Sequence, residues 1–94
     1  MYIVHTLYDL ENQGIESEVR IFAKKDNAIK SAKIEKDNFI KEIFKNEKPE
    51  VDEQESLDSE EVYSCVVQGY DDYWRVSVEK MLVLDEEYQS QKNR

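Results

Sequence analysis

One stretch of helical periodicity, over residues 26–47, most constrains what this chain can fold into. Apolar side chains recur there on one side of a helix, at Ala28, Ile29, Ala32, Phe39, Ile40 and Ile43. A single amphipathic helix must bury this side against another element. We expect Asp26 or Asn27 to cap its first turn, and Pro49 to prevent its continuation.

The segments on either side of the helix have the alternating pattern of strands. Residues 2–8 alternate two faces rich in β-branched and aromatic side chains, and residues 19–22 form a short second strand. Residues 61–68 and 73–84 predict two more strands, joined by a hairpin turn at 69–72. The order β-β-α-β-β predicts a two-layer α+β domain, an antiparallel sheet with one long helix packed on one face.

The length of the chain favours one domain. A single core is possible in 94 residues, and 39% hydrophobic with 11% aromatic residues is too apolar for a disordered chain. We therefore expect one domain over residues 1–94, with a tail that frays at about 86–94. The expected core residues are Ile29, Phe39, Ile43, Val66, Trp74, Val76 and Val78.

Charge is segregated along the chain, whose net charge is −9. Residues 19–48 carry +4, whereas residues 49–61 hold seven acids and no base. A block of like charges repels itself and is usually solvated, so we expect an acidic loop at about 49–61. The summed negative field also repels phosphate, so direct binding of nucleic acid is not expected.

Few side chains suit catalysis or metal binding. One cysteine, one histidine and two glycines exclude an internal disulfide, a Cys-rich zinc site, a two-His metal motif and a phosphate-binding glycine loop. His5 and Cys65 each sit within an alternating strand pattern, and Asp71-Asp72 lies in an exposed turn. The acidic block lacks the glycine of a calcium loop. We expect no enzyme activity, no catalytic residue, no cofactor and no metal.

The compartment is expected to be the cytoplasm. No apolar run reaches ten residues, so no membrane span is predicted. The first residues lack the basic and apolar regions of a signal peptide, and a single cysteine fits a reducing compartment.

Aromatic and acidic residues crowd the second hairpin next to the acidic block. Tyrosine is enriched at interface hot spots, and carboxylates around it steer a basic partner. Trp74 alternates with Val76 and Val78, which favours a place in the core. The predicted partner-binding residues are Glu50, Asp52, Glu53, Glu55, Asp58, Glu60, Glu61, Tyr70, Asp71, Asp72 and Tyr73.

A small, acidic, cysteine-poor α+β chain without a catalytic motif resembles a class of inhibitors encoded by phages and mobile elements. The class includes anti-CRISPR proteins, anti-restriction proteins and immunity proteins that neutralise basic nucleases. The resemblance is one of composition over the whole chain. It implies an acidic inhibitor that occupies the basic nucleic-acid-binding surface of a nuclease or a CRISPR or restriction effector, by mimicry of nucleic acid.

Two other interpretations remain open. The chain would instead be a structural or regulatory homo-oligomer without catalytic activity, which buries residues 81–84 or an exposed sheet edge against its own copy. The second open question is the role of the basic outer side of the helix. Its lysines would bind the phosphates of a nucleic acid, remain solvated, or attract the acidic block. This basic face consists of Lys30, Lys33, Lys41, Lys45 and Lys48.

Overall fold

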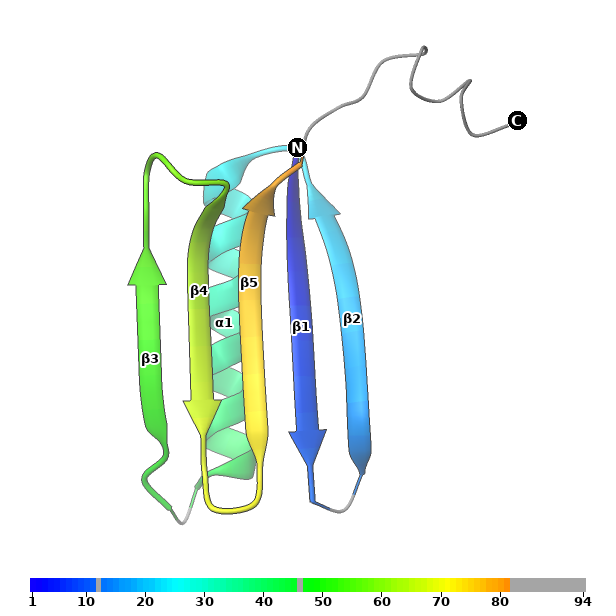
Figure 1. Ribbon diagram of the computed structural model, residues 1–94, viewed down its shortest axis with the longest axis vertical. Coiled ribbons are helices and arrows are strands. Elements are labelled where there is room, and N and C mark those ends of the chain that lie inside the picture. The colour runs from blue at the N-terminus through cyan, green and yellow to red at the C-terminus, as the bar shows by residue number, and fades with distance from the viewer. Residues whose placement is uncertain (12, 46, 82–94) are drawn as a thin grey trace, which may run out of the picture.

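One helix lies across one face of a five-stranded antiparallel sheet in the computed structural model, which describes residues 1–11, 13–45 and 47–81 (Figure 1). The elements are β1 (Tyr2–Leu10), β2 (Gly14–Phe22), α1 (Lys25–Ile43), β3 (Glu50–Glu55), β4 (Glu61–Gln68) and β5 (Tyr73–Lys80). The strand order is β2-β1-β5-β4-β3, so β2 and β3 form the two edges. The expected α+β class with one helix on an antiparallel sheet is confirmed, with one strand more than expected.

The core lies between α1 and the three central strands. Val4 pairs with Val78 across β1 and β5, and Cys65 pairs with Val76 across β5 and β4. All four side chains are fully buried on the face that α1 covers. Because α1 contributes alanines to this contact, at Ala28 and Ala32, the helix backbone can approach the sheet closely. The opposite side of the sheet, here called the open face, has no helix over it within residues 1–11, 13–45 and 47–81.

The expected core is confirmed for β5 and corrected elsewhere. Trp74, Val76 and Val78 are buried, and Ile29 and Phe39 are half-buried against them. Two expectations are wrong. Ile43 is 39% exposed because the chain leaves the helix after it, and Val66 points to the open face because Cys65 and Val67 take the side under α1.

The helix ends four residues earlier than expected, because Phe44 turns into the core. Phe44 leaves helical geometry with φ −104° and is 2% exposed. Its ring meets Phe39 edge-on at a centroid distance of 5.5 Å. Gly69, in the turn between β4 and β5, makes room for this ring, since a side-chain carbon there would overlap it.

We predict that Gly69→Ala lowers the free energy of unfolding by about 1–3 kcal/mol, because the buried Phe44 ring would have to move. Chemical denaturation measures the change. Gly14→Asn is the control, since Gly14 has φ +81° in open space and asparagine tolerates that conformation. Equal stability of Gly69→Ala and the wild type would contradict the role assigned to Gly69.

Two further expectations about this half of the chain are corrected. The loop predicted at 49–61 contains β3, because its backbone pairs with β4 from Glu50 to Glu55. Lys24, rather than Asp26 or Asn27, is the N-cap of α1, and it makes no side-chain capping bond. Asp26 lies in the first turn instead, where its carboxylate complements the positive end of the helix dipole.

The ends of the strands also differ from the sequence prediction. β2 begins at Gly14 and is much longer than the predicted segment 19–22, because it pairs with β1 along its full length. β5 ends at Lys80. The predicted continuation over residues 82–84 and the predicted frayed tail at 86–94 lie outside the described residues.

Candidate functional site

The edge strand β3 carries its acidic side chains on two different faces. All six of its residues are exposed. Glu53 and Glu55 pair with Cys65 and Tyr63, so they stand on the side that α1 covers. Glu50 and Asp52 alternate with them and therefore belong to the open face.

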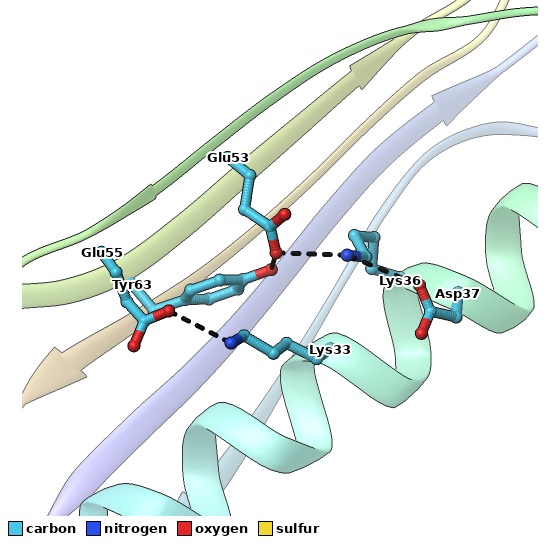
Figure 2. A network of polar contacts seen from close by, with 6 residues as sticks. All are labelled: Lys33, Lys36, Asp37, Glu53, Glu55 and Tyr63. Carbon is cyan, nitrogen blue, oxygen red and sulfur yellow. Dashed lines mark hydrogen bonds and ion pairs between the residues drawn. The ribbon is translucent and has the colours of Figure 1, made fainter.

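The carboxylates on the helix side are neutralised by α1 (Figure 2). Lys33 Nζ lies 3.1 Å from Glu55 Oε1, and Lys36 Nζ lies 3.1 Å from Glu53 Oε2. The Tyr63 hydroxyl donates a hydrogen bond to the same oxygen of Glu53. Glu53 and Glu55 thus attach the edge strand to the helix, and their role in partner binding stays a prediction.

These contacts hold Glu53 as a fixed anion rather than an acid or base. The hydrogen bond from Tyr63 and the contact with Lys36 keep the pKa of Glu53 below its ordinary value, against the opposing effect of partial burial. Burial and the hydrogen bond to Glu53 raise the pKa of Tyr63. A carboxylate with a lowered pKa beside a phenol with a raised pKa exchanges no proton near neutral pH.

The pH dependence of stability provides a test of this network. Because the folded pKa of Glu53 is lowered, its contribution to stability is complete above its unfolded pKa of about 4.3 and is lost as the pH falls through the folded value. We predict that Glu53→Gln is less stable than wild type at neutral pH and that this difference shrinks below about pH 4.3. Urea denaturation over a pH series measures it. Glu50→Gln, on the same strand, is the control, and an identical pH profile for both variants would contradict the network.

The pair of His5 and Cys65 is separated by the sheet. Cys65 is fully buried under α1, and burial raises the pKa of its thiol to about 11. A thiol with this pKa is protonated at neutral pH and is a poor nucleophile. His5 is exposed and pairs with Ser77, on the open face. The structure therefore forms no thiol–imidazole pair from these residues.

Two more of the predicted partner-binding carboxylates are used within the fold. Glu61 Oε2 lies 3.2 Å from Arg75 Nη2, across β4 and β5. Asp72 Oδ1 accepts a hydrogen bond of 2.9 Å from the backbone N–H of Glu11, which joins the loop after β1 to the turn after β4. Asp72 and Glu61 therefore have structural contacts within the chain, and their role in partner binding stays a prediction.

The remaining predicted residues fall into two groups at opposite ends of β4. Asp58 and Glu60 lie in the loop before β4, whereas the other five lie where β3 begins and β4 ends. The eight residues of β4 separate the ends by about 26 Å at about 3.3 Å per residue. The predicted set therefore does not form one surface. The larger group consists of Glu50, Asp52, Tyr70, Asp71 and Tyr73.

The larger group is continuous across neighbouring strands. Gln68 pairs with Glu50 on one side and with Tyr73 on the other, so one row of the open face crosses β3, β4 and β5. The side chain of Tyr70 is 91% exposed, and its backbone N–H is held by Glu47 Oε2 at 3.0 Å. These contacts place the turn beside the beginning of β3.

Sequence reasoning missed one member of this group. Asp9 of β1 is exposed and pairs with Tyr73, which extends the same row by one strand. The alternation of Ile3, His5 and Leu7 already indicated the face of Asp9, because every second residue of a strand points the same way. We call the six residues the acidic end surface: Asp9, Glu50, Asp52, Tyr70, Asp71 and Tyr73.

The basic face of α1 is divided by these contacts. Lys33 belongs to the pair with Glu55, while Lys30, Lys41, Lys45 and Lys48 are exposed and form no ion pair within the described part of the chain. The attraction between the helix and the acidic block, one of three interpretations, is thus observed for Lys33 among these five lysines, and for Lys36 outside the basic face.

No metal site is present among residues 1–11, 13–45 and 47–81, because no three His, Cys, Asp or Glu side chains converge there. The helix α1 lacks the apolar length that a membrane crossing requires. Comparison of the chain with protein-family models, with curated proteins and with solved structures finds no match.

Proposed function

We propose that the chain is a non-catalytic inhibitor whose acidic end surface binds the basic nucleic-acid-binding surface of a nuclease or of a CRISPR or restriction effector. One observation carries the proposal. On β3, the two carboxylates facing α1 have lysine partners, whereas Glu50 and Asp52 have no cation partner within the described residues. The fold neutralises one face of the strand and leaves the other face charged.

The geometry of the two unpaired carboxylates suits a surface that normally binds phosphates. Glu50 and Asp52 stand two residues apart on an extended strand, which spaces them by about 6.6 Å. This spacing is close to twice the axial distance of about 3.4 Å between phosphates of one DNA strand. A pair of carboxylates at this spacing supports mimicry of nucleic acid.

The aromatic members supply contact area beside the charges. Tyr70 is almost fully exposed at the tip of the turn, and Tyr73 is half-buried on the open face. Tyrosine side chains bury a large area at low entropic cost, while surrounding carboxylates increase the rate of encounter. We therefore assign anchoring to Tyr70 and Tyr73, and steering to Asp9, Glu50, Asp52 and Asp71.

A competition experiment tests the proposal. The full chain is immobilised, a lysate of its native host is applied at low ionic strength, and retained proteins are eluted by salt. We expect a nucleic-acid-binding protein to elute, because exposed charges are screened over about 8–10 Å at physiological salt. The full chain should then displace DNA or RNA from that purified protein. A retained protein that binds the chain and nucleic acid simultaneously would contradict occupation of the nucleic-acid site.

A further inference from the structure

The strand β2 forms the edge of the sheet opposite β3, and its properties are different. It is nine residues long, whereas β3 has six, and it contains no proline. Three apolar side chains on its open face are exposed, Ile15 by 72%, Val19 by 59% and Ile21 by 55%. A long edge strand with exposed apolar residues is a template for pairing with another strand.

The charges of β2 select one antiparallel register with a second copy. In a two-fold pairing centred on Val19, each Glu18 lies opposite Arg20 of the other copy, whose guanidinium also pairs with Glu35 of its own α1 at 3.0 Å, and seven residues of each strand pair. A centre at Glu18 also places Glu16 opposite Arg20 at two positions, but it brings the two Glu18 side chains opposite each other. A centre at Ser17 places Glu16 opposite Glu18 twice. Opposite charges across strands stabilise a pair and like charges destabilise it, so the register centred on Val19 is favoured.

The apolar side chains agree with this register. The two Val19 side chains lie next to each other on the axis, and Ile21 lies opposite Ser17 of the second copy. Ile21 also pairs with Ile3 of its own β1, and Ser17 with Leu7. Val19 and Ile21 of both copies therefore lie near the axis on the open face, whereas Ile15 lies outside the seven paired residues.

From this complementarity we infer that the chain forms a two-fold dimer through β2, with a continuous sheet of ten strands centred on Val19. The inference goes beyond the proposed function and does not rest on it. The acidic end surface begins at β3, on the far edge, so each dimer presents two such surfaces. An edge-to-edge contact lies at the small end of interface sizes, so the dimer is expected to dissociate on dilution.

Sedimentation of the full chain over a range of concentrations tests the dimer. We expect a reversible monomer–dimer equilibrium that persists at high salt, because screening also relieves repulsion between two chains of charge −9. A monomer at every concentration would overturn the inference and leave the proposed function intact. Binding of the acidic end surface to a basic partner should instead weaken as the salt concentration rises.

Cross-linking tests the register. Facing side chains in an antiparallel pair have Cβ atoms about 4.5–5.5 Å apart, close to disulfide distance. Val19→Cys should therefore form a covalent dimer under mild oxidation. Ser17→Cys, on the same face and also exposed, should not. The native Cys65 is fully buried and should stay reduced in both variants. Equal cross-linking of the two variants would overturn the register.

Matched charge reversals give a second readout without new cysteines. Glu18→Lys places a lysine opposite Arg20 of the second copy at two positions, so we expect the dissociation constant to rise about tenfold. Glu16→Lys changes the net charge equally but faces Phe22, so it should not weaken the dimer. A weaker dimer with Glu16→Lys than with Glu18→Lys would indicate the register centred on Glu18 and refute ours.

Discussion

Replacement of Trp74 by alanine is expected to lower the free energy of unfolding by about 3–5 kcal/mol. The side chain is 1% exposed, and its ring stacks on Phe39 of α1 at a centroid distance of 5.2 Å. Its strand neighbours are Tyr8 and Val67, so it fills the middle of the layer between helix and sheet. A loss of this size is a large fraction of the stability of a domain of 94 residues.

Guanidinium denaturation of wild type and variant measures this effect. Tyr70→Ala is the matched control, because it removes an aromatic ring that is 91% exposed and should change stability by no more than about 0.5 kcal/mol. If Trp74→Ala and Tyr70→Ala had similar denaturation midpoints, the placement of Trp74 in the core would be refuted.

The parts of the fold that depend on local sequence were predicted well. The hairpin of β4 and β5 has strong alternation on both sides of a Gly-Tyr-Asp-Asp turn, so its strands begin and its turn lies where expected. Alternation also places a polar residue correctly. Thr6 lies two residues after Val4 and is buried on the same face, although it is polar. The Thr6 hydroxyl donates a 2.6 Å hydrogen bond to Glu35 Oε1 of α1.

The parts that depend on distant contacts were not predictable from one segment. The sequence of β3 is typical of a solvated acidic loop, because acidic residues occur on both faces and no alternation of apolar and polar residues is visible. It is a strand because its backbone pairs with β4, and the lysines that meet its helix-side carboxylates, Lys33 and Lys36, are about twenty residues away in the sequence. Phe44 was missed as a core residue for the same reason, since its cavity is formed by Gly69 in a later turn.

The arrangement of the candidate site in space could not be predicted from the sequence. Sequence reasoning gave all acids of the block one role, whereas the structure divides them by the face of the strand. Asp72 shows the limit most clearly, because only the fold reveals that its carboxylate binds the backbone of Glu11. Asp71, its direct neighbour, stays exposed in the same turn.

The largest functional effect is expected from charge reversal on the open face of β3. Glu50→Lys with Asp52→Lys removes the two unpaired carboxylates and should slow association with the captured partner by about tenfold or more, because steering by complementary charge raises association rates. The fold should be unaffected, since both residues are exposed and neither forms an ion pair within the described residues.

The association rate of the full chain with the captured nucleic-acid-binding protein, measured by surface plasmon resonance, tests the central claim most directly. The control variant Glu16→Lys with Glu42→Lys changes the net charge by the same amount at exposed residues of β2 and α1, on the side of the sheet opposite the open face. The proposed function predicts that the β3 variant associates much more slowly than the control and loses most of its salt dependence. Equal association rates for the two variants would show that net charge alone matters, and would contradict a binding surface on β3.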